Sequence, residues 1–421
     1  MEVTNLFLAI IYFQLTGILV FKLFVPQNEK TNVLYAIAVS WILGLGISTF
    51  AFFLFSLIFP QVTLVQILAI PFILAPVNYY FKKRVKVTLN KTDLIGISLV
   101  TFIGILLSMS AFAKPIFSFD AIAFWSAKAR AIFIDGRVTT DTLKLFMSSD
   151  YPLLVPISQA ITSIFVGSFN LVLLKGLTLI TSLNILILIY YSVSKYFHFW
   201  AAALTVIIVS SITPFMDLTI GEHAGEADIV FALILLATVL AFLHRQFLLS
   251  GILAACLIWT KQEGLMPTLI LSAIIFWKER KYFWQFASTP FLVSVSYFLF
   301  LKSGGVHGQY VLAGNYQRDI VKYILYPAQA FREEMRTLRL WNLVWWMFFA
   351  TILINFKKVL KYPTNVVAII FFGQVTFYVA VFAWTPHDQA TQVATTISRL
   401  VFQLLPLGIL LIALTLGKEN Y

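Results

Sequence analysis

The segment from Val33 to Phe59 reads VLYAIAVSWILGLGISTFAFFLFSLIF and contains no charged residue. A helix that rises about 1.5 Å per residue needs roughly 20 apolar residues to cross the hydrocarbon core of a bilayer. Other runs reach a similar length, namely Val3–Phe24, Leu94–Phe112, Leu171–Val193 and Ile397–Leu416. The alternating pattern of β-barrel strands does not occur. These runs predict a polytopic membrane protein built of helices.

The composition of the whole chain supports the same prediction. The 421 residues are 60% hydrophobic and only 11% charged, whereas soluble domains are about 25% charged. The net charge of +12 would suggest nucleic acid in a soluble protein. Here the basic residues lie in short loops between apolar runs, so no nucleic-acid partner is expected. The single cysteine, Cys256, excludes an internal disulfide.

The loop charges predict a topology, because Lys and Arg accumulate in cytoplasmic loops of membrane proteins. The main basic clusters are Lys82-Lys83-Arg84, Lys278 to Lys281, and Lys357-Lys358 with Lys361. With these clusters inside, the chain is an all-α bundle of about 12–13 transmembrane helices with its N-terminus outside. The expected parts are N-terminal helices over 1–93, a membrane module over 94–301 that contains a first external loop at 113–169, a second external loop at 302–340, and C-terminal helices over 341–421.

The apolar run Leu153–Phe169 decides this topology. If it crossed the membrane, every later basic cluster would move to the outside. The run is short, begins after Pro152 and contains Pro156. We expect a helix that lies in the outer face or dips into it; a true short span is the alternative.

The second external loop is expected to end in an interfacial helix. Phe331, Met335 and Leu338 fall on one helical face, and charged residues fall on the other. This pattern is typical of a helix that lies along a membrane surface.

A first group of polar residues opens the loop 113–169. Asp120 follows the span 94–112 and precedes an amphipathic segment that contains Trp125, Lys128 and Arg130. The carboxylate either caps the next helix or works as a general base on an acceptor hydroxyl. The two cations lie outside, against the charge rule, and bind either a phosphate-bearing ligand or lipid headgroups.

A second group precedes the span 227–243. Glu222, His223, Glu226 and Asp228 occur within seven positions of one another. Carboxylates and an imidazole suit a divalent metal, for which Glu222 and His223 are the candidates. They equally suit sugar hydroxyls, and a solvated acidic loop is the plainest interpretation.

Two further groups lie at the same predicted face. Lys261 occupies a tight external turn, and Arg399 lies near the outer start of the last span, shortly after His387. Ionisable groups at membrane depth are costly and mark functional sites by default. Carboxylates suit acid–base work on hydroxyls, and cations suit a phosphate leaving group. Together with apolar walls for a lipid tail, these groups favour an enzyme that takes a sugar from a lipid phosphate.

At these residues the chain resembles the C-type glycosyltransferase superfamily, whose members are polytopic enzymes that use polyprenyl-phosphate sugars. The features that carry the resemblance are, in chain order, Asp120 followed by Trp125 to Lys128, the segment Asp150-Tyr151-Pro152, the acidic loop that ends at Glu226 and Asp228, and Thr260-Lys261 to Gly264 with Ser398-Arg399.

The resemblance implies an inverting glycosyltransferase in the plasma membrane of a bacterium, with its active site facing outside and a glycan, lipid or protein as acceptor. It implies that Asp120 assists the acceptor nucleophile and that Asp228 or Glu226 supports the acceptor or the donor. It also implies that Lys261 and Arg399 bind the lipid phosphate. With Glu222 added, these acids are the expected catalytic set, and Lys128 and Arg130 complete the expected phosphate ligands. His223, Trp125, Tyr151 and His387 are the expected sugar or acceptor contacts.

Two other classes remain as alternatives. A polytopic lipid or sugar transporter, or a flippase, would also carry charges within its spans, but would more often show inverted repeats with broken helices. A non-catalytic assembly subunit would not need acids and cations gathered at one face.

Overall fold

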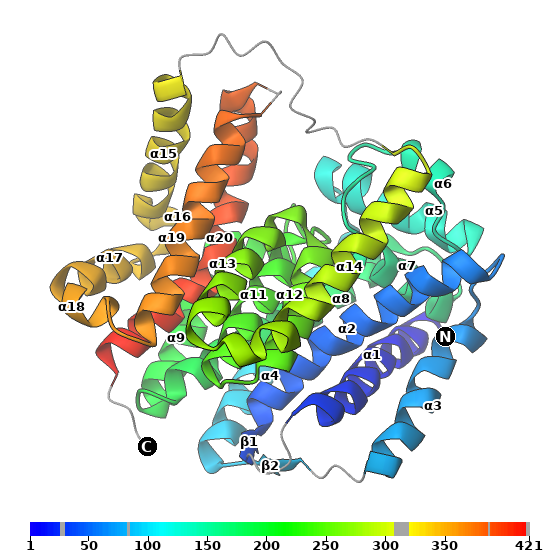
Figure 1. The fold of residues 1–421 in the computed structure, drawn as a ribbon, viewed down its shortest axis with the longest axis horizontal. Coiled ribbons are helices and arrows are strands. Elements are labelled where there is room, and N and C mark those ends of the chain that lie inside the picture. Colours follow the sequence, from blue (N-terminus) through cyan, green and yellow to red (C-terminus); the bar gives the residue numbers. More distant parts are fainter. Residues whose placement is uncertain (26–29, 82–84, 307–319, 386–387, 418–421) are drawn as a thin grey trace.

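The computed structural model describes residues 1–25, 30–81, 85–306, 320–385 and 388–417 (Figure 1). Within these ranges nearly all secondary structure is helical, which confirms the all-α prediction. The elements in chain order are α1 (Glu2–Phe24), β1 (Lys30–Asn32), α2 (Val33–Ile58), α3 (Leu64–Phe81), β2 (Lys86–Thr88), α4 (Lys91–Ala111), η1 (Ala121–Ser126), α5 (Ala127–Asp135), α6 (Thr140–Lys144), α7 (Leu154–Val166), α8 (Leu171–Ser194), α9 (Phe199–Ser211), α10 (Thr213–Thr219), α11 (Asp228–Leu243), α12 (Phe247–Thr260), η2 (Gln262–Gly264), α13 (Leu265–Lys278), η3 (Arg280–Tyr282), α14 (Phe283–Ser303), α15 (Ile320–Arg336), α16 (Leu338–Trp341), α17 (Val344–Ile354), α18 (Phe356–Val359), α19 (Thr364–Ala383) and α20 (Gln389–Leu416).

Every expected span corresponds to a helix, but the helices differ in length. Seven of the described helices are long and apolar enough to cross a membrane alone, or eight if α9 and α10, which meet at a 68° bend, form one span. The 16 residues of α11 reach only about 24 Å at the helical rise. The chain is therefore a multi-pass membrane protein, whereas a total of 12–13 crossings stays a prediction.

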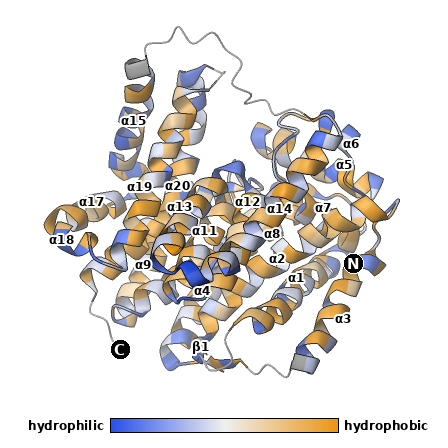
Figure 2. Cartoon of the chain, in the orientation of Figure 1, coloured by the Kyte–Doolittle hydropathy of each residue, from blue (hydrophilic) through white to orange (hydrophobic). Residues whose placement is uncertain are grey.

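Polar residues start the long apolar helices. The side chain of Asn32 accepts a hydrogen bond from the Leu34 N–H at 2.8 Å at the start of α2. Asp388 accepts from the Thr391 N–H at 2.8 Å at the start of α20. Such caps satisfy N–H groups that have no partner within the helix. Hydrophobic residues then cover most of each helix surface, as Figure 2 shows.

Several basic segments meet at one end of the bundle, which we call the basic end. The strands β1 and β2 pair in parallel there, with Lys30 opposite Lys86. Arg245 forms an ion pair with Glu279, and the ammonium of Lys278 lies 5.9 Å from the Tyr362 ring. The topology expected from loop charge requires these segments to lie together. The cluster Lys82-Lys83-Arg84 lies outside the described residues.

Helix α7 begins and ends at the opposite end of the bundle. Before it, the Asp150 carboxylate accepts a hydrogen bond from Gln262, just after α12, at 2.8 Å. After it, Ser168 and Asn170 bond to Glu2 at the start of α1. Both ends of α7 thus contact the same end of the bundle, whereas the absence of a membrane crossing by this run stays a prediction. Its apolar side chains are buried against α1, α2 and α5, so protein rather than lipid covers them.

Helix α15 packs against helices α19 and α20. Phe331 and Met335 are buried, and the Phe331 ring stacks on Tyr378 of α19 with centroids 6.1 Å apart. Leu338 belongs to the next helix and is 52% exposed. The three predicted residues therefore do not share one helical face, whereas an interfacial position of α15 stays a prediction.

Candidate active site

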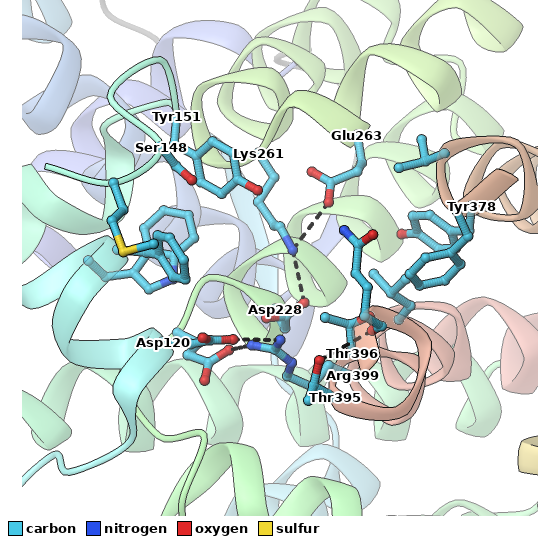
Figure 3. Close-up of a pocket in the computed structure, with 18 residues that line it drawn as sticks. Asp120, Ser148, Tyr151, Asp228, Lys261, Glu263, Tyr378, Thr395, Thr396 and Arg399 are labelled. Atoms are coloured by element: carbon cyan, nitrogen blue, oxygen red, sulfur yellow. Dashed lines mark hydrogen bonds and ion pairs between the residues drawn. The ribbon is translucent and has the colours of Figure 1, made fainter. Parts of the chain in front are cut away.

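A cavity of about 270 Å³ lies at the end of the bundle opposite the basic end (Figure 3). Its walls come from η1, the segment before α7, the start of α11, the turn after α12, and helices α19 and α20. Its charged lining residues are Asp120, Glu226, Asp228, Lys261, Glu263 and Arg399. Carboxylates thus outnumber cations in this lining. Each carboxylate forms an ion pair with Lys261 or Arg399, and we call this set of residues, with the side chains that bond to it, the network.

Arg399 binds two carboxylates from distant parts of the chain. One guanidinium nitrogen, Nη2, lies 2.8 Å from Asp120 Oδ2, and Nη1 donates to Glu226 Oε2. The side chain of Glu226 is fully buried, whereas that of Asp120 is 30% exposed. The two partners of Arg399 therefore differ in access to the cavity.

Lys261 forms the second part of the network. Its ammonium lies 3.1 Å from Asp228 and 3.3 Å from Glu263. The amide of Gln403, one helical turn beyond Arg399 on α20, donates to the same Asp228 oxygen. Asp228 is the first residue of α11 and is almost fully buried, so its charge depends on these partners.

His223 supports Glu226 from behind the cavity. Its Nδ1 lies 2.8 Å from Glu226 Oε1, and its Nε2 lies 3.6 Å from Asp217. Burial and the nearby Arg399 oppose a positive imidazole, but the hydrogen bond and charge of Glu226, with Asp217, raise the pKa of His223 above its usual 6.5. Ser118 also donates to Glu226, at 3.3 Å. Glu226 is therefore held in place by several donors.

The aromatic wall of the cavity lies over a buried lysine. Trp125 and Tyr151 line the cavity with ring centroids 5.8 Å apart. Lys128 is fully buried next to them, 5.6 Å from the Tyr151 ring, and donates to the Ser148 carbonyl. Burial lowers the pKa of Lys128 to about 8, although Asp150 opposes the shift. Lys128 thus fixes the wall rather than lining the cavity.

Most of the predicted site residues come together, and some do not. The cavity is lined by Asp120, Trp125, Tyr151, Glu226, Asp228, Lys261 and Arg399. His223 and Lys128 lie directly behind this lining. Glu222 is exposed outside it, and Arg130 lines a separate groove. His387 lies outside the described residues.

The proposed metal pair is engaged in other contacts. The backbone N–H of Glu222 donates to Asp217 at 2.8 Å, and His223 bonds to Glu226. Across the described ranges, no group of three or more His, Cys, Asp or Glu residues is arranged to hold a metal ion.

Three polar residues of the cavity network were not among the predicted set. They are Glu263, which lies within the motif from Thr260 to Gly264, and Gln403 and Tyr378, which no sequence motif indicates. The Tyr378 hydroxyl donates to Gln403, which in turn binds Asp228. A helical spacing of polar residues in an apolar helix could have identified Gln403, since it follows Arg399 by four positions.

Comparisons of this chain with protein-family models, with curated proteins and with solved structures find no match.

Proposed function

We propose that this protein is an inverting membrane glycosyltransferase that moves a monosaccharide from a polyprenyl phosphate to an acceptor hydroxyl. One observation carries the proposal: carboxylates and cations from η1, α11, α12 and α20 line one cavity together with aromatic rings. Carboxylates can orient and deprotonate a hydroxyl, cations can hold a phosphate, and aromatic rings can stack on a sugar. Loop charge supports an external position for this cavity.

The proposed reaction is a single displacement. The acceptor oxygen attacks the anomeric carbon and forms the new glycosidic bond, while the bond from that carbon to the phosphate oxygen breaks. The phosphate leaves with the bonding electrons, and the hydroxyl proton passes to the carboxylate of Asp120. The partly exposed position of Asp120 supports its role as the base, because a base must reach the acceptor.

The lipid part of the donor needs an apolar path to the cavity. Val381, Phe382 and Leu400 line the cavity on the side of α19 and α20. We assign the first isoprene units to this side. The acceptor, a glycan, lipid or protein, then enters from the side of η1, where Asp120 lies.

The ion pair between Arg399 and Asp120 suggests how binding of the donor phosphate releases the carboxylate of Asp120. Glu226 is buried and bonded to Arg399, His223 and Ser118, so it stays in place. Asp120 is partly exposed, and among the described residues Arg399 is its ion-pair partner. The donor phosphate competes with Asp120 for Arg399 and thereby frees the carboxylate for the acceptor. Donor binding therefore precedes acceptor activation.

The test uses purified protein in proteoliposomes with a radiolabelled polyprenyl-phosphate sugar. Asp120→Asn should lower transfer at least about 100-fold, since general bases contribute about 10²–10⁴. The same variant should bind sugar-free polyprenyl phosphate roughly fivefold more tightly, because it lacks the competing ion pair, worth about 1 kcal/mol.

Asp141→Asn serves as the matched control, because Asp141 is a highly exposed carboxylate in the same external segment. It should leave both measurements at the wild-type level. Full turnover by folded Asp120→Asn would refute the base, and failure of wild type to bind any polyprenyl phosphate would refute the function.

A flippase is the second candidate, and the 68° bend between α9 and α10 favours it. Broken helices are typical of transporters. A fluorescent polyprenyl phosphate that moves between leaflets, with no transfer to any acceptor, would support this alternative.

A further inference from the structure

A second cavity of about 500 Å³ lies on the other side of η1 from the charged cavity. Its apolar walls are Ile122 of η1, Phe133 and Ile134 of α5, and Phe169 and Leu171 at the start of α8. We call it the α5–α8 groove. Its lining is largely apolar, so a ligand that fits it must bring apolar surface.

The groove also carries one cation and one hydroxyl. Arg130 is exposed and lines the groove, and among the described residues no carboxylate forms an ion pair with it. Ser126 lines the groove one helical turn earlier, and within the described part of the chain its buried hydroxyl has no hydrogen-bond partner. An isolated guanidinium beside an apolar wall matches an anion that is joined to a hydrocarbon chain.

The position of the groove relative to the membrane indicates which class of ligand it binds. Leu171 is the first residue of α8, one of the seven long apolar helices. The groove therefore lies where a transmembrane helix begins, which is the level of lipid headgroups. Basic pockets between helices at this level bind anionic headgroups.

We propose that the α5–α8 groove binds an anionic phospholipid of the surrounding membrane. One acyl chain packs against Ile122, Phe133 and Phe169, and the phosphate binds the guanidinium of Arg130. A soluble phosphate would leave the apolar walls exposed to water. A zwitterionic lipid would bind Arg130 more weakly, because its own ammonium offsets the charge of its phosphate. This assignment does not depend on the proposed glycosyl transfer.

The bound lipid would contact the back of the segment that forms the charged cavity. The six residues of η1 present Ile122 and Ser126 to the groove, and Phe124 and Trp125 to the charged cavity. This segment is a π-helix, a form that is frequent at functional sites. The lipid therefore stabilises the wall that carries Trp125.

The experiment is native mass spectrometry of the purified full chain, titrated with phosphatidylglycerol or phosphatidylcholine. Wild type should bind phosphatidylglycerol more tightly. Arg130→Gln should weaken phosphatidylglycerol binding roughly fivefold and phosphatidylcholine binding less, as expected for one cation at an anionic headgroup. Arg137→Gln, an exposed arginine of the same segment that lines neither cavity, is the matched control.

A second variant tests the chain-binding wall. Ile134 is 65% exposed, so Ile134→Asn should fold, and it should weaken the binding of both phospholipids. The proposal is overturned if Arg130→Gln keeps the wild-type preference between the two lipids. It is also overturned if Arg130→Gln weakens only added undecaprenyl phosphate, because the groove would then belong to that lipid.

Discussion

Arg399 joins residues that are 279 and 173 positions away along the chain. A lysine would not reproduce this pairing, because an ammonium lacks the two separate, fixed nitrogens through which Arg399 reaches its two carboxylates. The buried Glu226 makes this pairing costly to break, since removal of one partner leaves an uncompensated charge. The network therefore stabilises the fold and arranges the cavity with the same contacts.

The pairing of His223 with Glu226 predicts a dependence of stability on pH. The folded pKa of His223 is raised above 6.5, so its contribution is fully present below that value and is lost as pH rises through the folded pKa. Between about pH 6 and about pH 9, the melting temperature of wild type should fall relative to that of His223→Asn. Thermal unfolding in detergent at several pH values measures this difference.

His198→Asn is a suitable control, because His198 caps α9 away from the cavity. It should retain the pH dependence of wild type. An unchanged pH dependence in His223→Asn would contradict the assigned role of the imidazolium.

Single residues of the cavity were partly predictable from the sequence. Asp120, Asp228, Lys261 and Arg399 stand out because charges near apolar runs are costly. Gln403 did not stand out, since a neutral amide within a helix carries a small penalty. Glu222 is the opposite case, since it is predicted to be catalytic but its side chain is exposed outside the cavity. Closeness in sequence to Glu226 is therefore not sufficient to place a residue in the cavity.

At the scale of elements, α1 and α2 approach each other through glycine. A Cβ on Gly17 would lie 1.6 Å from the carbonyl oxygen of Ser40, and one on Gly44 would lie 1.8 Å from that of Phe13. Backbone atoms cannot move aside as the end of a side chain can. These two glycines therefore set the separation of the two helices, as small residues do between membrane helices.

Gly17→Ala should thus destabilise the protein by about 2 kcal/mol or more, within the range for overpacked interiors. Gly104→Ala is the matched control, because its Cβ would meet the flexible end of Leu183 at 2.8 Å. The control should be neutral or stabilising, since alanine favours helix over glycine by about 1 kcal/mol. Melting temperatures in detergent compare the two, and equal values would contradict the close backbone packing.

The type of each element was easier to predict than its partner. Prolines and loop charges predict that the apolar run that forms α7 does not cross the membrane, and this stays a prediction. Its burial by α1, α2 and α5 was not foreseen, and neither was the packing of Phe331 on Tyr378. Hydrophobic periodicity identifies which face is buried, but lipid and protein satisfy an apolar face almost equally in a membrane.

At the scale of the whole molecule, the arrangement of α7 predicts which residues share one side of the membrane. The native Cys256 is buried, so cysteines can be introduced into a Cys256→Ala background. Asp141→Cys and Ser168→Cys, on either side of α7, should react with an impermeant maleimide added to the same face of sealed vesicles. Lys357→Cys, at the basic end, should react only after the membrane is opened.

If Ser168→Cys instead reacted together with Lys357→Cys, α7 would cross the membrane and the topology would be wrong. Apolar length predicts the helical membrane bundle, and the side on which each loop lies stays a prediction from loop charge. The meeting of η1 with α20 could not be predicted that way, because no local pattern encodes a contact between segments so far apart.

The position of Arg399 on α20, the last described helix, has a consequence for biosynthesis. The ribosome makes Asp120, Glu226 and Asp228 long before it makes Arg399 and Gln403. Until α20 enters the membrane, Asp228 can pair with Lys261, whereas Asp120 and Glu226 lack the guanidinium of Arg399. A buried carboxylate without a partner is unstable in an apolar interior. Insertion of α20 thus brings the guanidinium of Arg399 to Asp120 and Glu226, so the pairing of these acids is a late step in the assembly of the described helices.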